Sequence, residues 1–162
     1  MRLNRSEPLK VGFGFTDVLY QPERKSSMSR MFTVPVTVEF EDVDSYKIAH
    51  HTKLVAYCER ARIRFLSKLG LELYPDKMNI VLYSLNMRFK RPAQLMDTLD
   101  VSVFIESLDD YRLTLGYKIR RQSLLVATAS TGIAFMDVET GMLVPAPEKY
   151  VNGLRRFMDE NE

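Results

Sequence analysis

The sequence predicts an α+β domain in which an antiparallel sheet of about five strands packs against one long helix. Three observations support this prediction. Residues 34–40 alternate between apolar and polar side chains, residues 51–69 carry an apolar stripe at helical spacing, and residues 79–138 hold strand-like runs separated by short turns. A single long helix beside consecutive strands must bury its apolar stripe against the sheet, so helix and sheet share one core.

The first strand is predicted from the segment Val34–Phe40, where valine or phenylalanine alternates with proline, threonine and glutamate. A period of two residues is typical of a strand that is buried on one face. Pro35 has no backbone N–H to donate, which favours either an edge strand or a position at the beginning of the strand.

The long helix is predicted from His51 to Leu69. Gly70 follows directly, and glycine commonly ends a helix because it adopts the left-handed backbone conformation without strain. The apolar side chains of the helix recur at intervals of four or three residues, as one buried face requires. They are Leu54, Cys58, Ala61, Phe65 and Leu69.

Four strand-like runs and a short terminal helix follow. The strands are expected at Asn79–Lys90, Leu99–Ser107, Arg112–Arg120 and Leu124–Val138, and the helix at Tyr150–Met158. Polar turn residues separate the runs, as in the Asp-Asp pair at 109–110. A sheet that wraps one long helix is the hot-dog arrangement. Its exposed edges are usually paired with a second copy of the chain.

Composition indicates one soluble domain in a reducing compartment. The chain has 162 residues and a net charge of +2, which is too small to indicate nucleic-acid binding. Its one cysteine excludes an internal disulfide framework. No run approaches the roughly 18–20 apolar residues of a membrane span, and the N-terminus lacks a signal-peptide pattern. The expected location is therefore the cytoplasm.

Residues 1–30 differ from the rest of the chain. Their last third, Gln21–Arg30, is polar and is expected to be a loop or a linker. Met28 and Met31 are candidate starts of the compact part. We expect a flexible N-terminal extension over residues 1–30 and one folded domain over residues 31–162.

The segment Phe40–Arg62 is the strongest candidate for a functional site. A helix N-terminus presents unpaired N–H groups and a positive dipole, and both stabilise an oxyanion. A neighbouring carboxylate supplies a base or a nucleophile, so the combination suits the hydrolysis of a thioester or an ester. The carboxylates and histidines that precede or begin the predicted helix are Glu41, Asp42, Asp44, His50 and His51.

The same segment resembles the signature of the 4-hydroxybenzoyl-CoA thioesterase family, and within it the bacterial short-chain acyl-CoA thioesterases. The resemblance covers roughly residues 32–147, in the family's order and spacing. It rests on Glu41-Asp42-x-Asp44-Ser45, Ile48, His51, Tyr57-Cys58-Glu59-Arg60-Ala61-Arg62, Phe89-Lys90-Arg91-Pro92-Ala93, Asp97, Thr140-Gly141 and Pro145.

The resemblance implies a hydrolase that cleaves an acyl-CoA thioester to a free acid and CoA. Asp44 falls on the family's catalytic aspartate, which attacks the thioester carbonyl or activates water against it. The backbone N–H at His51 is the implied oxyanion donor, and the His51 ring is a second catalytic candidate. The family uses no metal or organic cofactor. Its active site lies at a subunit interface, which implies a homodimer or a homotetramer.

Two positions depart from the family pattern. Lys47 stands at a tight turn where most members carry glycine, and Leu54 follows Lys53 where members carry an asparagine and a tyrosine. Both are expected to alter the acyl pocket. They leave open an acyl-thioester-binding protein without turnover and a thioesterase that acts on an acyl-carrier protein. A dehydratase is less in keeping with the sequence, because the expected glycine- and proline-rich histidine loop is absent.

Further contacts with substrate are expected from basic side chains at the rim of the site. Lys90 and Arg91 precede Pro92 at the end of a strand and suit the phosphates of CoA. A row along one face of the helix suits them too, although such rows are commonly solvated. The row consists of Arg60, Arg64 and Lys68.

Three acidic or thiol side chains have ordinary structural explanations as well. Asp44 suits a turn or a helix cap, a role that does not exclude catalysis. Glu59 is either a second carboxylate of the site or the ion-pair partner of Arg62. Cys58 lies on the apolar stripe, so it is expected to be buried rather than nucleophilic.

Overall fold

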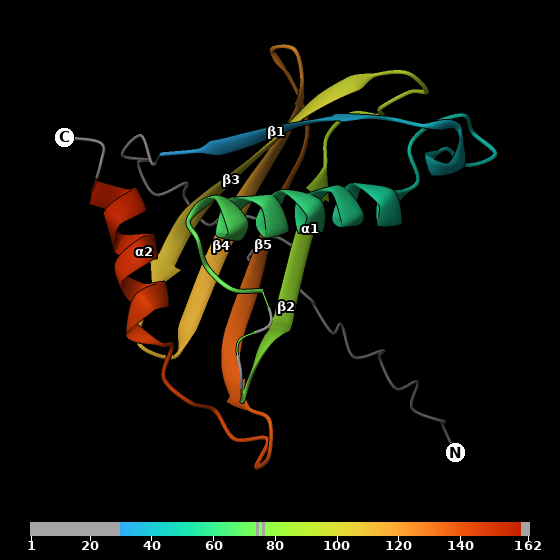
Figure 1. The fold of residues 1–162 in the computed structure, drawn as a ribbon. Coiled ribbons are helices and arrows are strands. Elements are labelled where there is room, and N and C mark those ends of the chain that lie inside the picture. The colour runs from blue at the N-terminus through green and yellow to red at the C-terminus, as the bar shows by residue number, and fades with distance from the viewer. Residues whose placement is uncertain (1–29, 74, 76, 160–162) are drawn as a thin grey trace, which may run out of the picture.

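The computed structural model describes residues 30–73, 75 and 77–159. The predicted flexible extension lies outside the described residues except for Arg30, so its role stays a prediction. The elements follow the predicted order along the chain (Figure 1). They are β1 Phe32–Thr37, the 3-10 helix η1 Phe40–Asp42, α1 His51–Lys68, β2 Met78–Phe89, β3 Thr98–Leu108, β4 Arg112–Arg121, β5 Leu124–Asp137 and α2 Glu148–Asp159.

The sheet confirms the α+β prediction. Its five strands are antiparallel and lie in the order β1-β3-β4-β5-β2. β1 is an edge strand, as Pro35 indicated. The other edge is β2, which is 12 residues long and pairs with β5. Among the described residues no strand pairs with the outer side of β2.

The first strand is shorter than predicted. β1 ends at Thr37, and Phe40, which the alternation assigned to a buried strand face, begins η1 and is 82% exposed. The Asp42 carboxylate accepts the Glu39 N–H at 3.0 Å, and the Asp42 N–H donates to the Glu39 carbonyl at 3.0 Å. These reciprocal hydrogen bonds turn the chain, so the strand cannot continue.

The helix α1 crosses one face of the sheet (Figure 1) and ends where predicted. Gly70 has a φ of 69°. The Leu71 N–H donates to the Leu66 carbonyl at 3.0 Å and the Gly70 N–H to the Ser67 carbonyl at 2.9 Å, which is the Schellman motif. The face of α1 that is buried against the sheet consists of Leu54, Tyr57, Cys58, Ala61, Phe65 and Leu66.

The second helix, α2, closes the core at the far end of α1. Phe157 of α2 meets Phe65 of α1 edge-on, with ring centroids 4.8 Å apart. Tyr150 of the same helix packs against Phe135 of β5 at 5.7 Å. None of the described helices is both long and apolar enough to cross a membrane.

Candidate active site

The segment before α1 is folded into a small hairpin that holds its polar residues beside the helix. Val43 and Ala49 form a β-bridge at its base. Inside it the Asp44 N–H donates to the Ile48 carbonyl at 3.0 Å. Ile48 also bridges Gln94, in the connection between β2 and β3. The hairpin is therefore held by a β-bridge at its base and by a second β-bridge to the connection between β2 and β3.

Asp44 caps the turn of the hairpin, the structural role that its residue type indicated. Its carboxylate Oδ1 accepts the Tyr46 N–H at 2.8 Å, and its carbonyl accepts the Lys47 N–H at 2.9 Å. The side chain is half-buried. Its second carboxylate oxygen makes no hydrogen bond within the described part of the chain. A base or nucleophile needs such an oxygen, because the oxygen must reach a water or a carbonyl carbon.

Lys47 adopts the left-handed conformation that the turn requires, with a φ of 62°. This conformation costs a residue with a side chain about 1–2 kcal/mol. The tight turn expected from glycine is thus formed with a lysine. Since the Tyr46 and Lys47 N–H groups both bond to Asp44, the lysine does not prevent the hairpin from closing.

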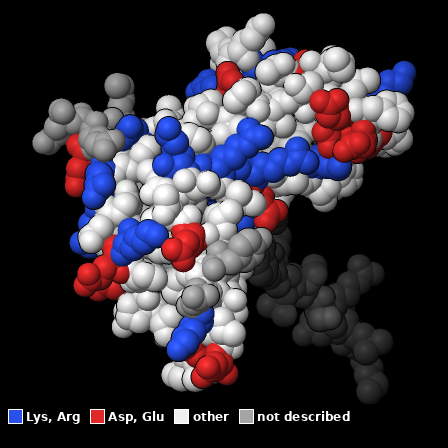
Figure 2. Space-filling model, viewed as in Figure 1, with Lys and Arg blue, Asp and Glu red and all other residues white. Residues whose placement is uncertain are grey.

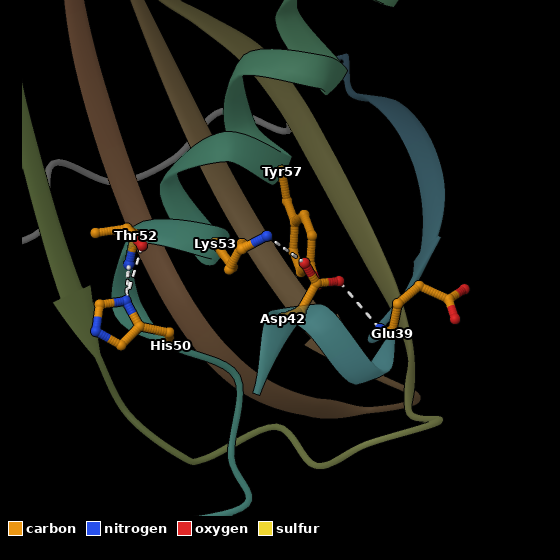
Figure 3. A network of polar contacts seen from close by, with 6 residues as sticks. All are labelled: Glu39, Asp42, His50, Thr52, Lys53 and Tyr57. Atoms are coloured by element: carbon orange, nitrogen blue, oxygen red, sulfur yellow. Dashed lines mark hydrogen bonds and ion pairs between the residues drawn. The ribbon is translucent and has the colours of Figure 1, made fainter. Parts of the chain in front are cut away.

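Asp42 is the buried carboxylate of the segment, at 3% exposure. Its Oδ2 accepts the Tyr57 hydroxyl at 2.7 Å and the Glu39 N–H at 3.0 Å, and its Oδ1 lies 3.0 Å from Lys53 Nζ (Figure 3). Lys53 and Tyr57 are one turn apart on α1. Asp42 therefore ties the chain before the hairpin to two successive turns of the helix.

The environment of Asp42 keeps it ionised. Burial acts to raise its pKa, but the hydrogen bonds from Tyr57, the Glu39 amide and Lys53 outweigh burial and lower the pKa below its ordinary value. Burial and the hydrogen bond to Asp42 raise the pKa of Tyr57, so its hydroxyl stays a neutral donor. With both oxygens engaged, Asp42 is a structural anchor rather than a base.

The first turn of α1 leaves one backbone donor for a ligand. His50 is the N-cap, and its Nδ1 accepts the Thr52 N–H at 3.4 Å and lies 2.7 Å from the Thr52 hydroxyl (Figure 3). The Lys53 and Leu54 N–H groups donate to the His50 carbonyl at 2.9 and 3.4 Å. The His51 N–H makes no hydrogen bond to any described residue. It can therefore bind an oxyanion, with the helix dipole behind it.

The end of β2 lies next to the start of α1. The exposed His51 ring meets the Phe89 ring edge-on at 6.5 Å and lies 4.1 Å from the His50 ring. Lys90 and Arg91 follow Phe89 directly and are exposed, and Arg91 Nη1 donates to the Leu125 carbonyl at 3.0 Å. The structure thus brings two residues predicted to bind phosphate close to the predicted oxyanion donor.

Leu54 and Glu59 lie apart from this group. The Leu54 side chain is 4% exposed and belongs to the core of the chain. Glu59 forms the expected ion pair with Arg62, at 3.4 Å. Cys58 is buried as expected, and burial raises the pKa of its thiol to about 12. The described residues contain no group of three or more His, Cys, Asp or Glu that could hold a metal ion.

Comparisons with known proteins agree with this architecture. Residues 38–154 match the thioesterase-like superfamily. The 1,4-dihydroxy-2-naphthoyl-CoA hydrolase of Synechococcus elongatus is 24% identical over 127 residues, which cover 75% of this chain and 93% of the hydrolase. The acyl-CoA thioesterase YbgC of Haemophilus influenzae is 24% identical over 111 residues, 66% of this chain and 82% of YbgC.

A solved structure supports the fold. The crystal structure of Slr0204, a 1,4-dihydroxy-2-naphthoyl-CoA thioesterase from Synechocystis, matches with a TM-score of 0.74 at 21% identity. The match covers 78% of this chain and 96% of Slr0204. At this level of identity the likeness establishes the hot-dog fold, and the chemistry has to be inferred from the residues of the site.

Proposed function

This chain belongs to the thioesterase-like superfamily and is a thioester hydrolase, and we propose that it cleaves acyl-CoA with Asp44 as its base or nucleophile. The observation that carries the proposal is the geometry before α1. The Asp44 carboxylate lies in the hairpin that leads into α1, and among the described residues neither its second oxygen nor the His51 N–H has a hydrogen-bond partner. Membership of the narrower 4-hydroxybenzoyl-CoA thioesterase family is part of the proposal and rests on the signature residues.

The proposed reaction begins with the thioester carbonyl oxygen against the His51 N–H. This donor and the helix dipole stabilise the negative charge that develops on the oxygen. Asp44 either attacks the carbonyl carbon to form an acyl-enzyme, which water then hydrolyses, or removes a proton from the attacking water. In both routes the carbon–sulfur bond breaks, and CoA leaves as the thiolate.

Binding of the nucleotide end is proposed for Lys90 and Arg91. Both follow Phe89, whose ring lies 6.5 Å from that of His51, so they flank the site where the thioester would sit. A guanidinium pairs with phosphate through two parallel hydrogen bonds, and a lysine adds a point charge. Lys47, exposed on the hairpin turn, supplies a third cation at the rim.

We further propose that a second copy completes the acyl pocket across β2. The outer edge of β2 pairs with no described strand, and β2 also carries exposed apolar side chains. Pairing with the β2 of a second copy would supply hydrogen-bond partners for the backbone of this edge and cover the apolar side chains. Since Phe89 also touches His51, the edge is continuous with the site. A homodimer is the smallest assembly that does this, and two such dimers in a homotetramer satisfy it equally. The exposed apolar residues of β2 are Leu82, Tyr83, Leu85 and Phe89.

Thiol release from acetyl-, benzoyl- and palmitoyl-CoA tests the proposal, with Asp44→Asn measured alongside the wild type. We expect hydrolysis to fall about 10²–10⁴-fold, as for loss of a general base, with an unchanged circular dichroism spectrum because asparagine caps the same turn. Glu41→Gln, a change at an exposed neighbouring carboxylate, is the matched control and should retain activity.

Two outcomes would change the assignment. Undiminished turnover by Asp44→Asn would remove Asp44 from the mechanism. No thiol release from any CoA thioester by the folded wild-type protein would favour a carrier-protein substrate or a protein that binds acyl thioesters without hydrolysing them. In that case Lys47, which is exposed on the hairpin turn, is the first residue to change, because Leu54 belongs to the core.

A further inference from the structure

A cavity lies at the opposite end of α1 from the candidate active site. His51 and Lys68 are the first and last residues of this 18-residue helix, so about 25 Å of helix separates the two places. The cavity has a volume of about 310 Å³ and opens where the start of β1, the end of α1 and α2 meet. Its lining includes Arg30, Phe32, Phe65, Lys68, Arg156 and Phe157.

The floor of this distal cavity is aromatic. Phe65 packs edge-on against Phe157 at 4.8 Å and lies 5.9 Å from Phe32, measured between ring centroids. Phe65 and Phe157 are both buried, at 0% and 7% exposure, and both belong to the hydrophobic core. The half-buried Phe32 ring is therefore the part of this aromatic cluster that a ligand would meet, and the buried Phe65 and Phe157 rings support it from behind.

The rim of the distal cavity is cationic. Arg30, Lys68 and Arg156 line it, and no described carboxylate does so. Lys68 and Arg156 are exposed and form no ion pair within the described part of the chain, while the Arg30 guanidinium lies 4.6 Å from the centre of the Phe157 ring. Figure 2 shows that Lys and Arg gather on this face along α1 and continue onto α2. An anion at the rim would pair with Lys68 and Arg156 through charge-assisted hydrogen bonds.

We propose that the distal cavity binds a small carboxylate with an apolar body, either aromatic or of medium chain length. The apolar body would lie on the phenylalanine floor, and the carboxylate would pair with Lys68 and Arg156. At about 30 Å³ per water-sized group, the volume suits about ten non-hydrogen atoms. A strongly hydrated inorganic anion would leave the aromatic floor unused, so the combination of floor and rim selects an amphiphilic ligand.

This binding site is independent of the proposed function. Only one extension rests on that function, namely that the acid released from the thioester belongs to the same chemical class and occupies the distal cavity. Binding measured without any thioester tests the site alone. Failure of thiol release would leave the site in place, and failure of binding would leave the proposed hydrolysis in place.

The test is calorimetric titration of the full chain with benzoate and octanoate. We expect Arg156→Gln and Lys68→Gln each to weaken binding about tenfold, the loss of one charge-assisted contact. The matched controls are Arg155→Gln and Arg64→Gln, changes to neighbouring cations on the same helices that do not line the cavity. Binding to both controls should equal that of the wild type.

Ligand controls separate the chemical classes. Benzamide has the body of benzoate without its charge, and inorganic phosphate has charge without an apolar body, so both should bind at least tenfold more weakly than benzoate. Chemical-shift changes at the Phe32 and Phe157 ring signals of the wild-type protein provide a second readout that needs no variant. The proposal is overturned by equal affinity in Arg156→Gln and wild type, by phosphate binding as tightly as benzoate, or by ring signals that do not move.

Discussion

Replacement of Asp42 by asparagine should lower the free energy of unfolding by about 3 kcal/mol. Asparagine keeps the shape of the side chain but places an NH₂ group opposite Lys53 Nζ, which now lies 3.0 Å from Oδ1. Lys53 is 34% exposed and can turn to solvent, so losing this ion pair costs about 1 kcal/mol. The hydrogen bonds from Tyr57 and the Glu39 amide lose a charged acceptor, which costs roughly 1 kcal/mol each.

Thermal and urea unfolding at one fixed protein concentration measure this effect, because subunit assembly makes apparent stability depend on concentration. For a chain of this size about 3 kcal/mol corresponds to a fall in melting temperature of about 6–12 °C. Glu41→Gln, at the exposed neighbouring carboxylate, should change the melting temperature little. A loss below about 1 kcal/mol in Asp42→Asn would refute the anchoring role, because it would be no larger than the loss of one ordinary hydrogen bond.

Three further predictions follow from the same region and from α1. Lys47→Gly should raise the free energy of unfolding in urea by about 0.5–1 kcal/mol, because relief of the left-handed lysine exceeds the added chain entropy; a destabilised variant would contradict this. The folded pKa of Asp42 lies below its ordinary value of 3.8, so its stabilisation is complete above that value and is lost as pH falls through the folded pKa. Acid unfolding followed by circular dichroism should show this loss, and Asp42→Asn should flatten it. Iodoacetamide at neutral pH should label Cys58 only on unfolding, because burial raises its pKa to about 12; rapid labelling of the folded protein would argue against a buried thiol.

Periodicity located the elements well because it records which side chains face the core. The long helix was expected at 51–69 and spans His51–Lys68, since the first four of the five stripe positions are buried and only Leu69, the C-cap, is partly buried. The order of the strands in the sheet, in contrast, cannot be predicted from periodicity. β2 pairs with β5 because of contacts between residues far apart in the chain, and no local pattern contains that information.

The error at Phe40 shows the limit of a two-residue period. Alternation continues through Phe40 in the sequence, yet the strand ends at Thr37. The turn comes from the Asp42 carboxylate bonding back to the Glu39 N–H. A short-range hydrogen bond of an aspartate outweighed the apolar alternation, as is common for this residue type near turns.

The anchoring role of Asp42 was missed for a related reason. Sequence spacing grouped the carboxylates of the segment but did not rank them by burial. Tyr57 offered a signal, since it lies beside Cys58 on the buried face of the helix and a buried tyrosine hydroxyl usually finds a hydrogen-bond partner. The acidic segment just before the helix contains the nearest carboxylates that could accept this hydrogen bond. The Tyr57–Asp42 hydrogen bond could therefore have been predicted from the sequence.

In the proposed mechanism Asp42, just before the hairpin, supports the fold, and Asp44, within the hairpin, carries the chemistry. Both oxygens of Asp42 are engaged, so any step that used it as a base would first have to break the contacts that hold the chain before the hairpin to α1. The Asp44 carboxylate accepts a single backbone N–H from the described residues, so in the proposed mechanism it holds the turn with one oxygen and meets a substrate or a water with the other. The contacts of Asp42 hold the segment that carries Asp44 next to the start of α1, and the proposed pairing of Asp44 with the His51 N–H depends on such fixed geometry more than on any particular residue type in the turn.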